Sequence, residues 1–275
     1  MTHLARPFLL LLLVLVCQLR TYAQSKIPLE VYAGNLKAVR VTIEGKPYRF
    51  LFDTGGGETI ISPQIAQALG KTPYGQLSAY RMSGEKVVFQ KSDSVTLSLS
   101  GQLLFQNQVA VWDLMSILPK GLPQLDGVIS LKTFSGKILG IDLKNNQLTV
   151  EDEKSFAARR KNLTLLNSRF ANGLAGNELS LFLEVQGSNK KLWFLFDSGN
   201  LGHILLSPST VQVLGLKASS APGTELQNVP LTLHRKALPA PATVKDILYD
   251  GALNFSFIKE NTYYLDLKKL QVWRD

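Results

Sequence analysis

Cysteine and histidine are scarce in this 275-residue sequence, and their scarcity removes several kinds of site. The single cysteine is Cys17, close to the start of the chain. Without a second cysteine there is no disulfide framework, and a thiolate metal site is excluded as well. Only His203 and His234 lie beyond the first 23 residues, and no cluster of metal-ligand residues surrounds them in the sequence. We therefore expect no metal and no cofactor.

Acidic residues are also in the minority. The chain has 30 Lys and Arg against 21 Asp and Glu, which gives a formal net charge of +9. A basic balance suits acidic partners in general. The sequence nevertheless has no basic run with interleaved aromatic residues and no zinc-finger, helix-turn-helix or RNA-reading motif. Nucleic acid is therefore not an expected partner.

Long apolar runs are absent too. The run at residues 7–17 follows a basic start and precedes a small-residue cleavage site after Ala23. These features predict a secretory signal peptide over residues 1–23, because a transmembrane helix needs about 20 apolar residues. Lipid attachment at Cys17 is a weaker alternative, since Val16 stands where a small residue is required. We expect an exported protein, periplasmic, cell-surface or secreted, with no integral membrane segment after signal removal.

The remaining 252 residues alternate between apolar and polar positions over long stretches that Gly, Asn and Pro separate. Period-two alternation predicts antiparallel hairpins, for example over 38–52, 93–101 and 178–196. Helical signals are short. Residues 62–70 and 207–215 each begin with Ser-Pro and end with Gly, as expected for a capped short helix. The pattern predicts an all-β protein with short helices.

An internal duplication organises the chain. The segment FLFDTGGGETIIS at 50–62 places Asp53 at the end of an apolar strand, and FLFDSGNLGHILLS at 194–207 places Asp197 in the same position. A Ser-Pro helix follows in both copies. An Asp-Gly pair begins a second shared block in each copy, and a further aspartate follows 16 residues later. The chain therefore consists of two related lobes.

The two lobes differ mainly between their landmarks. The first lobe is longer there, which leaves room for an additional hairpin. We predict this hairpin over Tyr80–Phe89, with Ser83 and Gly84 in its turn. The predicted organisation is a first lobe at 24–155, a connection at 156–174 and a second lobe at 175–275.

The repeated aspartate has a chemical use that a single copy would lack. An isolated Asp-Thr-Gly is usually a turn. Two equivalent turns in duplicated lobes can meet at a pseudo-two-fold axis, and Asp53 and Asp197 would then face each other. Two carboxylates a few Å apart share one proton, because ionising both is costly. Such a pair supplies a general base and a general acid to one water and one amide.

The residues after each aspartate fit the same arrangement. Gly55 and Gly199 let the backbone turn tightly with its amides aimed inward. Thr54 and Ser198 are positioned to hydrogen-bond across the axis and lock the two turns together. The competing phosphate-loop interpretation fails, because the glycines lack a following Lys-Ser or Lys-Thr. A serine-nucleophile site at Ser198 is also disfavoured, since no nucleophile elbow and no histidine base accompany it.

The two motifs, Phe52 to Gly55 and Phe196 to Gly199, together with the later Asp-Gly blocks, resemble the pepsin and retropepsin group of aspartic proteases in a single-chain, bacterial-type form. The resemblance implies a bilobal, pepsin-like all-β fold of two pseudo-two-fold related β-barrel lobes. It also implies a peptide or protein substrate in an interlobe cleft, a monomer, and an endopeptidase activity. By this resemblance Asp53 and Asp197 are the catalytic pair, and Tyr80, Ser83 and Gly84 belong to a substrate-binding flap.

Four residues depart from the pattern of this group. Gly56 and Asn200 follow the motif glycines where Ser, Thr or Ala is usual, and Ser130 and Asn254 replace glycines in the later blocks. We expect fewer hydrogen-bond donors at the carboxylates and hence a mildly acidic to neutral working pH. The alternative is a catalytically inactive pepsin-like peptide-binding or scaffolding protein. A dimer with one site per two chains is disfavoured, because both motifs stand in one chain.

Lesser candidates have simpler interpretations. Tyr74 could replace Tyr80 as the flap tyrosine, and either could instead pack on its lobe. His203 is near enough to the second motif to tune the site, although a surface or hydrogen-bonded role is the simpler one. Asp126 and Asp250, each before a glycine, are interpreted as turn residues.

Overall fold

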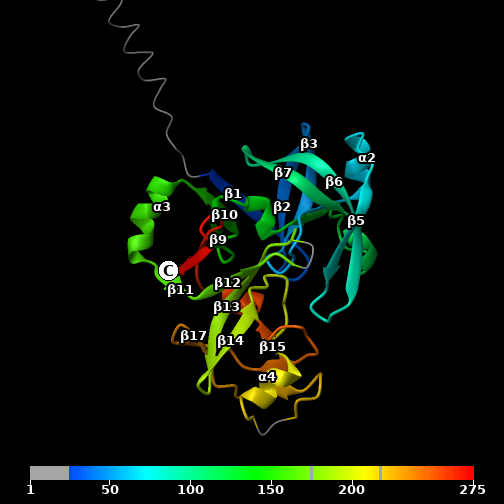
Figure 1. The fold of residues 1–275 in the computed structure, drawn as a ribbon. Helices are drawn as coiled ribbons and strands as arrows, with labels where there is room; N and C mark the ends of the chain where they lie inside the picture. The colour runs from blue at the N-terminus through cyan, green and yellow to red at the C-terminus, as the bar shows by residue number, and fades with distance from the viewer. Residues whose placement is uncertain (1–24, 174–175, 217–218) are drawn as a thin grey trace, which may run out of the picture.

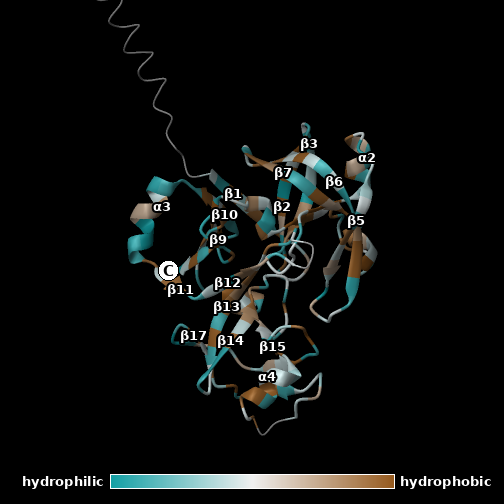
Figure 2. Ribbon diagram, viewed as in Figure 1, coloured by the Kyte–Doolittle hydropathy of each residue, from teal (hydrophilic) through white to brown (hydrophobic). Residues whose placement is uncertain are grey.

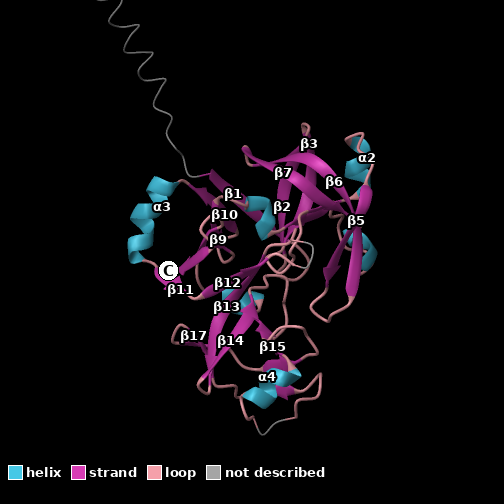
Figure 3. Cartoon of the chain, viewed as in Figure 1, coloured by secondary structure: helices cyan, strands magenta, loops and turns pink. Residues whose placement is uncertain are grey.

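The computed structural model describes residues 25–173, 176–216 and 219–275, and the predicted signal peptide lies outside them. Strands dominate, and short helices lie at the margins of two groups of strands (Figure 1, Figure 3). The predicted all-β class is therefore confirmed. Within the described residues, no helix has both the length and the apolar character that crossing a membrane requires.

The larger sheet has 13 strands and includes residues from both ends of the chain. Its strands follow in the order β11 (Thr164–Leu166), β22 (Gln271–Arg274), β21 (Tyr263–Asp266), β9 (Ile138–Asp142), β10 (Gln147–Glu151), β1 (Ser25–Val31), β2 (Lys37–Ile43), β3 (Lys46–Phe52), β8 (Gly127–Ile129), β4 (Ile60–Ile61), β7 (Gln102–Val111), β6 (Lys86–Leu99) and β5 (Tyr74–Tyr80).

The second sheet has nine strands, all from the later half of the chain. Eight follow in the order β16 (Glu225–Leu226), β19 (Ala242–Val244), β15 (Ile204–Leu206), β20 (Gly251–Ala252), β14 (Lys190–Leu195), β13 (Ser180–Gly187), β17 (Leu231–Leu233) and β18 (Lys236–Ala237), and β12 (Ser168–Ala171) pairs with β13. The helices are α2 (Pro63–Ala68), α3 (Glu153–Arg159), α4 (Pro208–Val213) and α5 (Phe255–Ile258), with 3-10 turns η1 (Leu114–Ile117), η2 (Leu131–Phe134) and η3 (Arg160–Asn162).

The end of the chain returns to the first half. Strand β21 pairs antiparallel with β9, and β22 pairs with both β21 and β11. The predicted second lobe, 175–275, thus contributes its last two strands to the sheet of the first. Figure 1 shows these terminal strands beside β9 and β10, away from β14 and β15. This shared sheet ties the two halves together behind the motif turns.

The duplication seen in the sequence is also a duplication of strand pairing. Motif strand β3 pairs parallel with β8, and motif strand β14 pairs parallel with β20. Both later strands then pair antiparallel with the strand after the motif, β4 or β15. The alternating pattern predicted antiparallel hairpins and gave no sign of these parallel pairs, because they join segments far apart in the chain.

The two predicted Ser-Pro helices are present as α2 and α4. The side chain of Ser62 accepts a hydrogen bond from Ile65 N at 3.2 Å, and that of Ser207 accepts one from Thr210 N at 3.1 Å. A serine at this position satisfies one of the free N–H groups of the first turn. The proline that follows each serine has no N–H to leave unpaired.

The two Asp-Gly blocks hold the motif strands in place. Asp126 Oδ2 accepts a hydrogen bond from Arg49 N at 2.9 Å, and Asp250 Oδ2 accepts one from Trp193 N at 2.7 Å. These carboxylates therefore bind the backbone of the facing strand, whereas the sequence suggested that they close their own turns. The neighbouring glycines allow this close approach.

Gly127 and Gly251 are required by packing. A Cβ atom on Gly127 would overlap the carbonyl oxygen of Ile60 and the ring of Phe50. A Cβ atom on Gly251 would overlap the corresponding groups in the second lobe, Leu205 and Phe194. Hydrophobic residues concentrate on these inner strands (Figure 2), and the largest buried apolar cluster includes side chains from both lobes.

We expect Gly127→Ala to lower the free energy of unfolding by about 2–3 kcal/mol or more, because the added methyl forces apart a packed strand pair. Gly202→Ala is the matched control, since its Cβ would meet nothing closer than Asn200 Oδ1 at 3.5 Å. Urea unfolding measures both variants. Equal midpoints for the two variants would contradict this account of the duplicated glycines.

Candidate active site

Both motif aspartates stand at the point where a buried strand ends. Asp53 follows β3 and donates its N–H to Ile129 O on β8 at 3.0 Å. Asp197 comes two residues after the end of β14, where Phe196 N donates to Leu181 O at 2.8 Å. Backbone hydrogen bonds to neighbouring strands thus fix the direction in which each motif strand enters its turn.

The two turns are joined directly by reciprocal hydrogen bonds. Thr54 N donates to Ser198 Oγ at 3.0 Å, and Ser198 N donates to Thr54 Oγ1 at 3.0 Å. The Thr54 hydroxyl also donates to Phe196 O at 2.7 Å. Thr54 is fully buried and Ser198 nearly so, so water cannot replace these bonds. The cross-axis contact predicted from the sequence is confirmed.

The motif glycines bring each carboxylate against the opposite turn. A Cβ on Gly199 would stand 3.0 Å from Asp53 Oδ1, and a Cβ on Gly55 would overlap the carboxylate of Asp197. Neither glycine has a positive φ. Their role is therefore close approach, whereas the sequence suggested conformational freedom for a tight turn. The structure brings Asp53 and Asp197 together.

Backbone N–H groups support the carboxylates. Gly55 N donates to Asp53 Oδ1 at 2.9 Å, and Gly199 N and Asn200 N donate to Asp197 Oδ1 at 2.8 and 3.2 Å. Within the described part of the chain, no side-chain hydroxyl donates to either carboxylate. Gly56 leaves room for one, since a Cβ there would lie 3.6 Å from Asp53 Oδ2.

Burial dominates the electrostatics of the pair. Desolvation raises the pKa of Asp53, against the lowering effect of the nearby backbone N–H groups. Desolvation also raises the pKa of Asp197, and the negative charge of Asp53 raises it further. Because each charge disfavours the other, the pair titrates as a unit and holds one proton over an intermediate pH range.

A pocket of about 350 Å³ opens over the two carboxylates. Its lining combines apolar residues, most of them from the first lobe, with polar groups from the start of the second lobe. Tyr80, Arg81 and Met82 of the β5–β6 hairpin cover it. Apolar residues in the lining include Leu51, Ile60, Phe89, Trp112, Leu114 and Val128.

The predicted flap is the β5–β6 hairpin. Arg81 N donates to Glu85 O at 2.9 Å, and Gly84, with φ of 83°, closes the turn by donating to Arg81 O at 2.8 Å. Tyr80 lines the pocket, whereas Ser83 is exposed and does not. Tyr74 bonds to Asp93 Oδ2 at 2.6 Å, outside this pocket.

The hairpin tip also contacts the second lobe. Leu248 N donates to Met82 O at 3.0 Å, and a Cβ on Gly84 would lie 3.3 Å from Leu248 Cδ2. Tyr249 follows and lines the pocket. The sequence gave no sign of either residue, because nothing in the loop before the second Asp-Gly block marks it as a partner of the hairpin.

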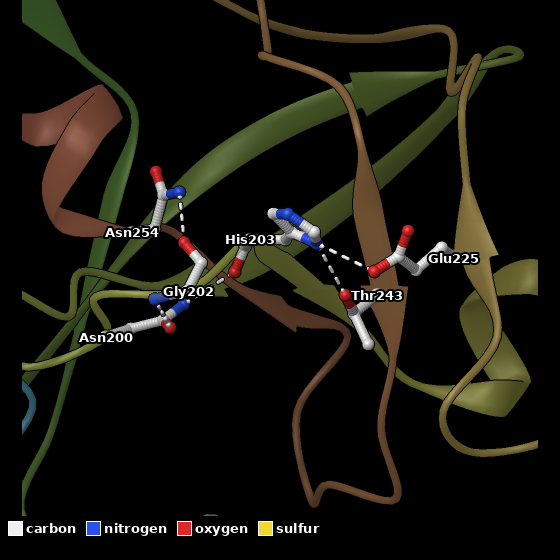
Figure 4. A network of polar contacts seen from close by, with 6 residues as sticks. All are labelled: Asn200, Gly202, His203, Glu225, Thr243 and Asn254. Carbon is white, nitrogen blue, oxygen red and sulfur yellow. Dashed lines mark hydrogen bonds and ion pairs between the residues drawn. The ribbon is translucent and has the colours of Figure 1, made fainter.

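Amide side chains support the second turn. Asn200 Nδ2 donates to His203 O at 3.0 Å, and Gly202 N donates to Asn200 Oδ1 at 3.2 Å (Figure 4). Asn254 Nδ2 donates to Gly202 O at 2.6 Å, and its Oδ1 accepts from Phe257 N at the start of α5. The departures at Asn200 and Asn254 therefore form a network of their own.

His203 belongs to the outer part of this network. Its Nδ1 lies 2.9 Å from Thr243 Oγ1 and 3.8 Å from Glu225 Oε1, and its ring points toward these two residues (Figure 4). In the first lobe Ser130 is fully buried, and its hydroxyl has no hydrogen-bond partner among the described residues. Among the described residues, no group of three or more His, Cys, Asp or Glu side chains is close enough together to bind a metal ion.

Residues 39–143, which contain the first motif, match the model of a family described as aspartyl protease. The first lobe is thus similar to the aspartyl protease family. Two solved structures, basic 7S globulin from soybean and conglutin gamma, a basic 7S globulin from lupine seeds, are similar to it. In each case the TM-score is 0.55 and the identity 9%, over 92% of this chain and 94% of the other. At this identity the likeness shows the bilobal pepsin-like fold alone. A search of curated proteins found no match.

Two carboxylates in this pocket were not marked by any pattern in the sequence. Glu58 follows the first motif and is bound to Lys132 Nζ at 2.7 Å. Glu178 comes just before β13 and lines the pocket. Glu58 could have been noticed from its place beside the glycines. Glu178 lies 120 residues away, and only the fold brings it there.

We expect Thr54→Val to lower the free energy of unfolding by about 2–4 kcal/mol, because Ser198 N and Phe196 O would both be buried without a partner. Thr54→Ser keeps the hydroxyl and should stay within about 1 kcal/mol of the wild type. Urea unfolding compares the two variants. Equal destabilisation by valine and serine would show that the cross-turn bonds contribute little.

Proposed function

We propose that the protein is an exported aspartic endopeptidase that hydrolyses peptide bonds with a water activated between Asp53 and Asp197. The observation that carries the proposal is that each carboxylate lies against the glycine of the opposite turn. The family match of the first lobe supports the same chemistry. Export rests on the signal sequence alone, and a periplasmic, cell-surface or secreted location is part of the proposal.

The reaction follows from one shared proton. The ionised carboxylate takes a proton from the water, and the water oxygen attacks the amide carbon. At the same time the protonated carboxyl donates its proton to the carbonyl oxygen. The tetrahedral intermediate then breaks at the C–N bond, and the leaving nitrogen takes a proton from the pair. Because Thr54 and Ser198 hold the turns, the carboxylates keep their separation through these steps.

The substrate would lie in the pocket between the turns and the β5–β6 hairpin, as an extended peptide. The contact between Met82 O and Leu248 N spans this space, so the hairpin must release Leu248 before a long peptide can enter. A single chain supplies both aspartates, and we propose a monomer as the working unit.

A second candidate function is a pepsin-like protein that binds peptides without cleaving them. It is favoured by the departures at Gly56, Asn200, Ser130 and Asn254, and in particular by the absence of hydroxyl donors to the carboxylates among the described residues. The two similar solved structures are also named as globulins. Binding and turnover must therefore be measured separately.

We expect the mature protein to cleave an unstructured protein substrate and a statine-type inhibitor to block the cleavage. Asp53→Asn should lower kcat by about 10³-fold or more, because an amide can neither share the proton nor act as a base. Mass spectrometry of the products measures cleavage, and thermal unfolding checks that the variant is folded. Inhibitor binding without cleavage by the wild-type protein would instead favour the second function.

We expect maximal activity at mildly acidic to neutral pH. A raised pKa for both carboxyls shifts the range in which the pair holds one proton upward, so activity should fall on either side of that range. Gly56→Ser adds a hydroxyl donor near Asp53 and should move the pH profile of kcat/KM downward, whereas Gly56→Ala should leave it in place. A wild-type maximum in strong acid would contradict this prediction.

A further inference from the structure

The pocket over the aspartate pair is acidic, although the protein as a whole is basic. Its lining holds four carboxylates, Asp53, Glu58, Glu178 and Asp197, and a single cationic side chain, Arg81. The sequence as a whole has a net charge of +9. A pocket whose charge opposes that of the molecule attracts ligands of the opposite sign to its own lining.

Two of these charged groups already have partners. Arg81 Nη1 lies 3.5 Å from Glu85 Oε2, on the exposed turn of the hairpin. Glu58 is 5% exposed and binds Lys132 Nζ at 2.7 Å. Burial raises the pKa of Glu58 to about 7, and the Lys132 ammonium opposes that rise. Glu58 with Lys132 is therefore a satisfied structural pair. The aspartate pair carries one charge for catalysis. Glu178 is therefore the remaining carboxylate of the pocket that has neither an ion-pair partner among the described residues nor a catalytic role.

Glu178 is fixed in position by backbone contacts. Leu179 N donates to Gly57 O at 2.9 Å, directly beside the first motif turn. The stem of Glu178 packs on the same turn, since a Cβ on Gly57 would stand 2.8 Å from Glu178 Cβ. Its own N–H donates to Asn172 O at 3.0 Å. The side chain therefore starts from a rigid base next to Asp53.

The carboxylate of Glu178 has no hydrogen bond or ion pair with any other described side chain. Lys132, the nearby cation, is engaged by Glu58. Partial burial raises the pKa of Glu178, and the charge of Lys132 opposes that rise only in part, so the ionised form is not fully compensated in the free protein. A cation from outside would compensate it.

Aromatic rings stand beside this carboxylate. Glu178 lines both the pocket over the aspartates and an adjoining pocket of about 530 Å³, and Tyr80 and Tyr249 line both as well. Phe182 packs edge-on against Tyr249 with ring centroids 4.9 Å apart, in the adjoining pocket. A carboxylate next to aromatic faces suits a lysine or arginine side chain, whose stem packs on the rings while its cation meets the charge.

We propose that Glu178 is a specificity-determining residue that selects a lysine or arginine side chain of the peptide substrate in a subsite beside Asp53 and Asp197. The inference rests on the proposed function, because it assigns a substrate preference to the same site. The apolar wall formed by Leu51, Ile60 and Val128 takes an apolar side chain on the other side. The preferred substrate is thus a basic peptide with an apolar residue near the scissile bond.

The test compares matched peptides that carry arginine or its neutral isostere citrulline at each of the four positions flanking an apolar residue. At one position the wild-type protein should cleave the arginine peptide with a kcat/KM at least about 10-fold higher. Glu178→Gln should abolish this ratio. Asp246→Asn removes an exposed carboxylate from the loop before Leu248 that lines neither pocket, and it should keep the ratio.

Equal kcat/KM for arginine and citrulline peptides at every position would overturn the proposal. An equal loss of the ratio in Asp246→Asn would also overturn it, because a general field effect would then explain the preference. If no peptide is cleaved, the endopeptidase proposal fails while the subsite remains testable. Fluorescence polarisation of labelled arginine and citrulline peptides then decides it: binding must favour arginine, and Glu178→Gln must remove the preference.

Discussion

The hydrogen bonds between Thr54 and Ser198 are the constraint on which the site depends. They join two turns that are 144 residues apart in the sequence, in a place that water does not reach. Two buried carboxylates repel each other when both are ionised, so their own interaction does not hold them close at every pH. The neutral hydrogen bonds between Thr54 and Ser198 hold the two turns together whatever the protonation state of the carboxylates. The glycines then allow the approach, since a side chain on either would displace the opposite carboxylate.

The two lobes reach this meeting point by the same route. In each, a motif strand lies parallel to a short strand that begins with Asp-Gly, and the aspartate of that block binds the backbone of the motif strand. The surroundings of the two turns differ, however. Amide side chains of Asn200 and Asn254 support the second turn, whereas the first has only glycine at position 56. The pair is thus symmetric in its backbone and asymmetric in its outer support.

The pocket combines the paired aspartates of the two turns with groups from the surrounding loops. In the proposed reaction, the paired aspartates act on groups common to all peptides. A different property, the choice of substrate and its access to the pocket, would depend on Glu178, Tyr249 and the contact between Met82 and Leu248. They come from loops, where the lobes have diverged most, and loops of this kind carry specificity on a rigid scaffold.

The sequence by itself determined the duplicated architecture, the all-β class, the capped helices and the pairing of Asp53 with Asp197. These features follow from local patterns that occur twice, and repetition is visible without coordinates. Only the tertiary structure decided that β21 and β22 join the sheet of the first lobe and that the motif strands have parallel partners. It also decided that Asp126 and Asp250 bind the backbone of the facing strand and that Glu178 lies in the pocket. Each of these depends on contacts between distant segments, and the residues involved look ordinary in their local sequence. Tertiary packing selects such contacts, and the alternation of apolar and polar residues in the sequence does not predict them.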